Sequence, residues 1–141
     1  MFAFLYTLGI YLAQSAAQLA ALFHPKTRLW LDGQKHSWPL LTAHFEKKST
    51  SEIKGRGSQK TPVLWFHAAS LGEFEQGRPA IEACRKQYPG AEIILTFFSP
   101  SGYENKKKYD QVDLVCYLPA DTPANVKRFL DVVQPDMALF I

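Results

Sequence analysis

From residue 61 to residue 141, four short apolar runs alternate with three segments of helical periodicity. The apolar runs are 63–66, 93–98, 112–118 and 137–141. Between the first two runs, for example, Phe74, Ile81, Cys84 and Tyr88 recur at helical spacing. Continuous apolar strands that alternate with helices are typical of a parallel sheet covered on both faces. The sequence therefore predicts an α/β fold with a Rossmann-like parallel sheet over residues 61–141.

Each predicted helix has a recognisable start. Ser70 to Glu73 and Ser101 to Glu104 match the capping-box pattern, and Thr122-Pro123 places a proline at a first helical position. The loops that precede these helices follow the strands directly. In open parallel sheets, ligands bind beyond the carboxyl ends of the strands. We therefore expect Glu73, Ser99 and Asp121 to lie along one edge of the sheet and to mark the site.

Glu73 has two interpretations. It is either the structural partner of Ser70 in a capping box, or a carboxylate placed at the ligand-binding edge. The sequence pattern alone favours the structural role. Gly72, beside it, would allow a ligand to approach the backbone closely, whereas His67 at the end of the first strand is more typical of a structural histidine.

Several kinds of site are excluded or unsupported. The dinucleotide fingerprint G-x-G-x-x-G and the P-loop are both absent, and no His, Cys or acidic cluster has metal-ligand spacing. Cys84 and Cys116 are too few for a disulfide scaffold and form no C-x-x-C pair. We therefore expect no cofactor, no metal and a reducing compartment.

The first 23 residues carry no charged side chain, and 18 of them are apolar. Their polar residues Thr7, Gln14 and Gln18 fall on one line of a helix, with Ser15 beside them. The segment lacks the basic start of a cleaved signal peptide, which disfavours that alternative. A helix buried in a soluble core is also disfavoured, because such helices are seldom apolar almost all round. A helix that inserts into a membrane or lies on it fits best, and the basic residues that follow place the rest of the chain on the cytoplasmic side.

Residues 24–60 hold eight basic residues and three acids and show little periodicity. We expect a basic connecting segment, with a short turn-forming unit at 29–33, an apolar plug at 38–40 and a loop from Glu46 to Lys60. Its charges have two interpretations, a solvated linker or a contact with anionic lipid. Nucleic-acid binding is disfavoured, because aromatic residues are not interleaved with the basic ones.

Four further motifs occur together in a fixed order and spacing. They are WFHAASLGEF at 65–74, TFFSPSGY at 96–103, YLPADTP at 117–123, and VKRFL at 126–130 followed by Pro135. In these motifs the chain resembles the N-terminal domain of bacterial 3-deoxy-D-manno-octulosonic acid (Kdo) transferases over nearly its whole length. The basic stretches 24–28 and 33–35 are also similar to that family, which commonly has an arginine where this chain has Gln34.

The resemblance implies the N-terminal half of a two-domain GT-B glycosyltransferase, anchored by its apolar helix to the cytoplasmic face of the bacterial inner membrane. Such enzymes transfer Kdo from CMP-Kdo to a lipid A precursor (lipid IVA), with inversion and without a catalytic metal. It implies that Glu73 is the general base, which reverses the preference stated above. It also implies that Ser70 and Gly72 shape the loop, and that Ser99, Ser101 and Gly102 contact the acceptor.

The chain ends at Ile141, within its fourth predicted strand. In the family a donor-binding domain follows, so we expect a fragment that lacks the CMP-Kdo site and is inactive alone. The first alternative is a membrane-tethered module that binds an anionic glycolipid without chemistry; a downstream nucleotide-sugar domain would exclude it. The second, a nucleic-acid adapter, would require binding with a steep dependence on salt.

Overall fold

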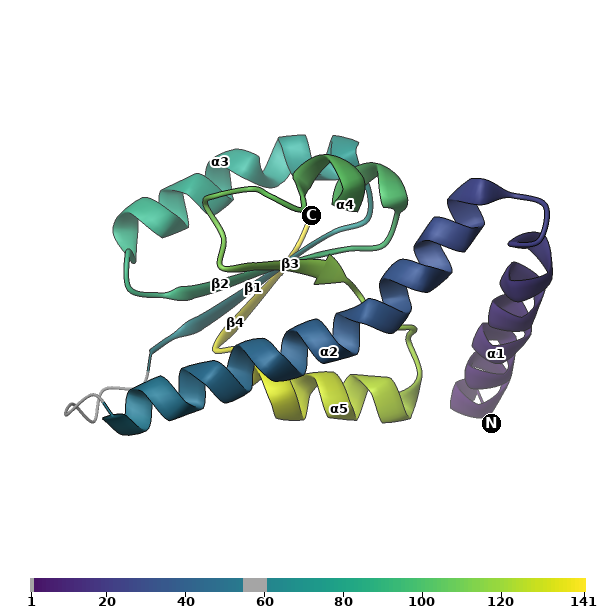
Figure 1. Cartoon of the computed structure of the whole chain (residues 1–141), viewed down its shortest axis with the longest axis horizontal. Coiled ribbons are helices and arrows are strands. Elements are labelled where there is room, and N and C mark those ends of the chain that lie inside the picture. Colours follow the sequence, from purple (N-terminus) through teal and green to yellow (C-terminus); the bar gives the residue numbers. More distant parts are fainter. Residues whose placement is uncertain (1, 55–60) are drawn as a thin grey trace.

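The computed structural model describes residues 2–54 and 61–141 (Figure 1). Its elements, in chain order, are α1 (Phe2–Ala20), α2 (Pro25–Lys54), β1 (Val63–Ala68), α3 (Leu71–Gln87), β2 (Glu92–Phe97), α4 (Pro100–Lys106), β3 (Leu114–Tyr117), α5 (Pro123–Val133) and β4 (Met137–Phe140).

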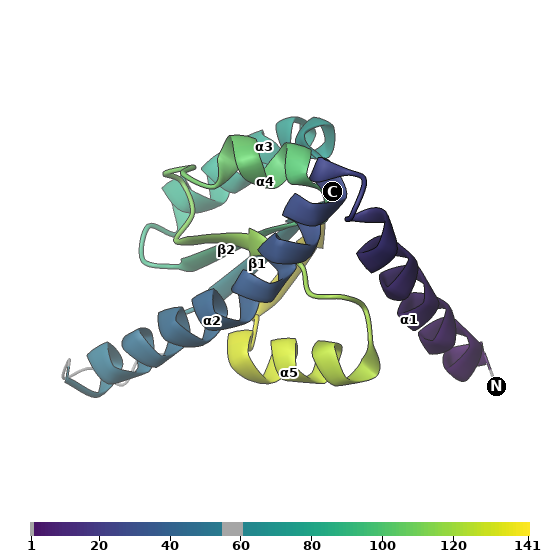
Figure 2. The same cartoon turned by 45° about the vertical axis from the view of Figure 1, so that its right-hand side comes forward.

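The four strands form one sheet in the order β3-β2-β1-β4, and every neighbouring pair is parallel. Helices α3 and α4 cover one face, and α2 and α5 cover the other, as Figures 1 and 2 both show. The prediction of an α/β fold built on a parallel sheet is confirmed, and the arrangement is consistent with a Rossmann-like fold.

The sheet is buried on both faces, which explains why its strands are continuous apolar runs. In β1, Phe66 belongs to the core under α3 and α4, whereas its neighbour Trp65 belongs to the core under α2 and α5. Phe74 and Phe97 also belong to the first core, and Phe129 packs against Trp65 in the second. Because successive side chains of a strand point to opposite faces, both sets must be apolar.

Helix α2 corrects the expectation for residues 24–60. The segment predicted to be irregular is one helix of 30 residues, and the predicted turn at 29–33 and plug at 38–40 both lie inside it. The predicted loop from Glu46 is helical as far as Lys54, and its remainder at 55–60 lies outside the described residues. The helix forms because one side of it packs on the sheet, with Ser37 and Leu41 buried.

The predicted helix starts are correct in two cases of three. Ser70 and Thr122 are the residues that precede α3 and α5, and Thr122 Oγ1 accepts a hydrogen bond from the backbone N–H of Asn125 (3.3 Å). Helix α4 instead begins two residues earlier than Ser101 suggested, after Ser99. Its first residue is Pro100, and the fixed φ of proline suits that position.

Helix α1 lies at the side of the molecule and contacts α2 (Figures 1 and 2). The hydroxyl of Tyr6 also donates a hydrogen bond to Asp121 Oδ2 (2.6 Å), in the β3–α5 connection. None of the helices in the described segments combines the length and the apolar character that a membrane crossing requires.

Candidate functional site

The carboxyl ends of β1, β2 and β3 share one edge of the sheet, because the three strands are parallel and adjacent. Backbone hydrogen bonds join the connections that leave this edge. The N–H of Ser99 donates to the carbonyl of Ala69 (2.9 Å), and that of Leu118 donates to the carbonyl of Phe97 (2.8 Å). Glu73, Ser99 and Asp121 therefore follow the same edge, as the sequence predicted.

Glu73 lies in the first turn of α3 and is half-buried. The hydroxyl of Ser70 donates a hydrogen bond to its Oε2, and Ser70 makes no side-chain bond to the helix backbone. The two residues are thus paired, but not as the reciprocal capping box that the sequence indicated. Ser70 instead holds the carboxylate of Glu73 in one orientation.

Gly72 leaves open space beside this pair. A Cβ added at Gly72 would have only Ser70 Oγ within 4 Å, at 3.8 Å, and the residue is exposed. No packing requirement therefore accounts for a glycine at this position. A ligand could approach the backbone of α3 here, directly next to the carboxylate.

His67 belongs to a hydrogen-bonded chain beneath the edge. Its Nδ1 lies 2.9 Å from Thr96 Oγ1, and the indole N–H of Trp65 donates to the same oxygen (2.8 Å). Burial lowers the pKa of His67, while a hydrogen bond with the backbone of Thr96 and the charge of Glu73 raise it by less. The imidazole is therefore neutral near pH 7, with one nitrogen fixed by the buried Thr96.

The β2–α4 connection carries the other predicted site residues. The hydroxyls of Ser99 and Ser101 share a hydrogen bond of 2.7 Å. Gly102 is buried, and a Cβ added there would lie 2.1 Å from Cδ1 of Phe97. Close packing of α4 on the sheet is enough to account for this glycine, whereas the two hydroxyls remain at the edge.

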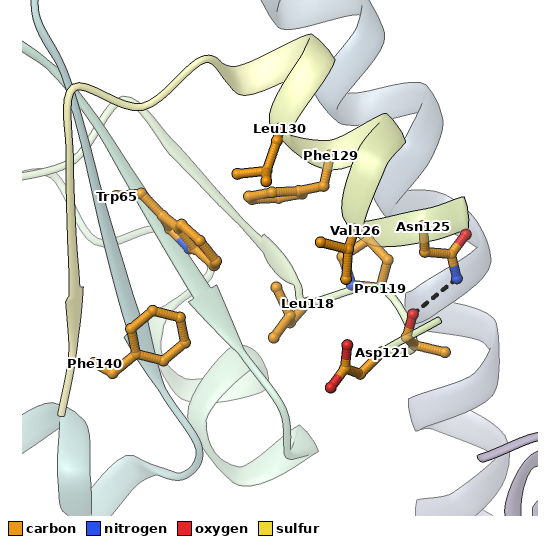
Figure 3. Close-up of a pocket in the computed structure, with 10 residues that line it drawn as sticks. Trp65, Leu118, Pro119, Asp121, Asn125, Val126, Phe129, Leu130 and Phe140 are labelled. Atoms are coloured by element: carbon orange, nitrogen blue, oxygen red, sulfur yellow. Dashed lines mark hydrogen bonds between the residues drawn. The ribbon is translucent and has the colours of Figure 1, made fainter. Parts of the chain in front are cut away.

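Sequence reasoning did not anticipate an apolar cavity of about 320 Å³ on the α5 face of the sheet (Figure 3). Figure 3 shows Trp65 from β1, Phe140 from β4 and Phe129 from α5 around it. Asp121 and Asn125 lie at its β3–α5 side, where Asn125 Nδ2 donates to the carbonyl of Ala120 (2.9 Å). The alternation of side chains along β1 places Trp65 and Phe66 on opposite faces of the sheet. Only the tertiary structure brings the rings of Trp65, Phe129 and Phe140 together.

The arrangement suits proton transfer at a ligand hydroxyl. It presents an oriented carboxylate at an open position, with neighbouring hydroxyls that can hold a polar ligand. Among residues 2–54 and 61–141, no three His, Cys, Asp or Glu side chains are grouped so that they could hold a metal ion.

Residues 38–141 match a family model described as 3-deoxy-D-manno-octulosonic-acid transferase (kdotransferase). A 3-deoxy-D-manno-octulosonic acid transferase of Aquifex aeolicus is 34% identical over 103 residues, which are 72% of this chain and 26% of that protein. The enzyme of that name from Haemophilus influenzae is 34% identical over 77 residues, 54% of this chain and 18% of the relative.

A probable mitochondrial 3-deoxy-D-manno-octulosonic acid transferase of Arabidopsis thaliana is 30% identical over 114 residues, 79% of this chain and 24% of the relative. The chain thus spans about a quarter or less of the length of these relatives. No solved structure is significantly similar to it.

Proposed function

The chain belongs to the Kdo transferase family, and on that premise we propose that it is the acceptor-side, N-terminal part of an inverting GT-B glycosyltransferase. The proposed reaction transfers Kdo from CMP-Kdo to a lipid A precursor (lipid IVA) in lipopolysaccharide biosynthesis. The relatives are named as transferases of 3-deoxy-D-manno-octulosonic acid, which supports the Kdo transfer itself. The donor would be held mainly by the three quarters of the enzyme that this chain does not cover, and the fragment alone would be inactive.

The observation that carries the proposal is the carboxylate of Glu73, oriented by Ser70 at the carboxyl edge and beside the open position at Gly72. Glu73 would act as general base. It would take the proton of the acceptor hydroxyl while that oxygen forms its bond to the anomeric carbon of Kdo. CMP would leave from the opposite side with the electron pair of the broken bond, which inverts the anomeric centre.

The remaining contacts follow from the same edge. Ser99 and Ser101 would bind polar groups of the acceptor with their hydroxyls, and Gly102 would place α4 close enough for them to do so. Helix α1 would rest on the cytoplasmic face of the inner membrane. The exposure of Leu22 (75%) and Phe23 (81%), which follow it, supports contact with lipid. Neither a cofactor nor nucleic acid has a part in this proposal.

The test is Glu73→Gln in the full-length enzyme. Removal of a general base is expected to lower the rate of Kdo transfer by about 10²–10⁴-fold. The change is expected to alter the free energy of unfolding by at most about 1 kcal/mol, since it only weakens one charge-assisted hydrogen bond of a half-exposed group.

The matched control is Glu75→Gln on the same helix, whose carboxylate pairs with Lys106 (2.8 Å). This variant should retain near-normal turnover. Near-normal turnover of Glu73→Gln as well would reduce Glu73 to a structural role.

A further inference from the structure

His67 interrupts an otherwise buried strand. The other five residues of β1 are buried, whereas His67, near the carboxyl end of the strand, is half-buried. It lies on the same face of the sheet as Trp65, two residues nearer the edge that carries Glu73. Its ring contacts Phe140, with centroids 5.5 Å apart, and Figure 3 shows Phe140 beside the apolar cavity. The reaction proposed for Glu73 assigns no part to this histidine.

The hydrogen bonds within the fold hold the ring of His67 but do not require a histidine. The buried hydroxyl of Thr96 accepts a hydrogen bond from the indole N–H of Trp65 (2.8 Å). The same hydroxyl lies 2.9 Å from His67 Nδ1 and 3.4 Å from the carbonyl oxygen of Phe66. Trp65 and Thr96 therefore have partners without the imidazole, whereas the imidazole is kept in one orientation by Thr96.

The second ring nitrogen of His67, Nε2, is accessible to a ligand. It has no hydrogen-bond partner among the described residues. It is also not one of the buried side-chain atoms that lack a partner, which in these residues are the indole nitrogen of Trp30 and the hydroxyl oxygen of Tyr117. Nε2 therefore reaches the surface at the carboxyl end of β1, where the ligand-binding edge lies.

The charges around Nε2 decide which chemical group it can bind. The imidazole is uncharged near pH 7, because burial lowers its pKa, and the negative charge of Glu73 acts on it. An anionic group here would be repelled by Glu73, and the neutral ring would offer no charge in compensation. A hydroxyl is suited, because it both donates and accepts and so bonds to Nε2 whichever ring nitrogen carries the proton.

We propose, building on the proposed function, that His67 Nε2 binds a hydroxyl of the acceptor sugar next to the hydroxyl that Glu73 deprotonates. One contact at His67 and one at Glu73 would fix the orientation of the sugar and so decide which of its hydroxyls reaches the base. His67 takes no part in making or breaking bonds. Its hydrogen bond is the same before and during the transfer, so its energy contributes to acceptor binding and not to the chemical step.

Two substitutions of His67 separate the two ring nitrogens. His67→Asn keeps a polar atom near the position of Nδ1 and loses the one at Nε2, whereas His67→Gln does the reverse. Initial rates of Kdo transfer by the full-length enzyme are measured against the concentration of the lipid A precursor, at saturating CMP-Kdo. His67→Asn should raise the KM for the acceptor about ten-fold and change kcat less than about three-fold. His67→Gln should recover most of the loss, with a KM raised no more than about three-fold.

The matched control is His44→Asn. His44 is also half-buried, but it pairs with Glu92 at the start of β2, at the opposite edge of the sheet. This variant should change the KM for the acceptor less than about two-fold. Thermal unfolding of each variant is recorded in parallel. Partial unfolding lowers the apparent kcat but leaves KM unchanged, so it does not imitate the expected result.

Three results would overturn the proposal. One is a KM for the acceptor in His67→Asn that equals that of the wild type. Another is a larger KM in His67→Gln than in His67→Asn, which is the order expected if only the bond to Thr96 mattered. The third is a loss in kcat alone in a variant with an unchanged melting temperature. Glu73→Gln acts on kcat instead, so the role of His67 and the role of Glu73 can fail separately.

Discussion

At the scale of single residues, two glycines of the proposed site are present for opposite physical reasons. A side chain at Gly102 would overlap the ring of Phe97, whereas one at Gly72 would meet almost nothing. The first glycine is needed so that α4 can pack on the sheet. The second is not needed for packing. Its lack of a side chain instead leaves the backbone of α3 open to a ligand.

Alanine substitutions measure this difference. Gly102→Ala should lower the free energy of unfolding by about 1–3 kcal/mol, because the core must move to accept the methyl group. Gly72→Ala should raise it by up to about 1 kcal/mol, since alanine loses less entropy than glycine in a helix. Urea unfolding of both variants checks the prediction, and a stable Gly102→Ala protein would show that α4 does not pack as described.

His67 should make stability depend on pH. Burial lowers its folded-state pKa below the ordinary 6.5. Near pH 6.5 the imidazole therefore binds a proton in the unfolded chain but not in the folded one. The free energy of unfolding falls as the pH drops through that value. His67→Gln should lose less stability than the wild type between pH 7.5 and 5.5. Equal losses, measured by urea unfolding at each pH, would contradict a buried neutral imidazole.

At the scale of elements, α2 shows where sequence reasoning failed. Its packed side does recur at helical spacing, through Trp30, Gly33, Ser37, Leu41 and His44. Only two of these five are strongly apolar, because Gly33 must admit the ring of Tyr117 and the hydroxyl of Ser37 bonds to the carbonyl of Gly33 (3.2 Å). The periodicity was therefore hidden from a search for apolar residues.

Pro39 lies inside α2 and is exposed. Proline in a helix interior removes a backbone hydrogen bond and crowds the preceding turn. Pro39→Ala should therefore raise the free energy of unfolding by about 1–3 kcal/mol. Ala43→Gly, at an exposed position one turn later, is the control and should lower it by about 1 kcal/mol. Neither change would matter in urea unfolding if this segment were the irregular linker that the sequence suggested.

The strands and the remaining helices were predictable, since their signals are local. Apolar runs buried on both faces specify the parallel strands, and Thr122-Pro123 specifies the start of α5. The chemistry of the edge followed from the same reasoning, because parallel strands must bring Glu73 and Ser99 to one side. The sequence predicted that Ser70 pairs with Glu73, but it did not predict which atoms bond. A serine at this position can cap the helix backbone or donate to the carboxylate.

At the scale of the whole molecule, two cavities depend on contacts between distant segments, and sequence reasoning found neither. The larger one joins β1, α5 and β4, and a smaller one joins α2 to the β2–α4 connection. Local patterns name the side of an element that is buried, but they do not tell which other element will cover it or how completely. Trp30 illustrates the limit, because the sequence could not show that its N–H is buried without an acceptor among the described residues.

The orientation of α1 is a property of the whole molecule as well. The polar residues Gln14 and Gln18, noted in the sequence, line a hollow together with Gln34 and Lys35 of α2. Large apolar side chains of α1, such as Leu12 and Leu19, are instead 63% and 67% exposed. A helix that turns its polar stripe toward the protein and its apolar side outward is suited to lie on a lipid surface.

This orientation predicts how the chain binds vesicles. Replacing Leu12 and Leu19 together by Gln should reduce flotation with anionic vesicles about ten-fold or more, because the apolar area that enters the lipid is lost. Replacing Gln14 and Gln18 by Ala should leave flotation nearly unchanged, since these side chains face α2. Deletion of residues 1–23 should abolish flotation yet change the urea unfolding of the remainder little, because α1 packs at the side of the fold, where it contacts α2 and donates the Tyr6–Asp121 hydrogen bond. Flotation of the deleted protein in high salt would show that another surface holds the membrane.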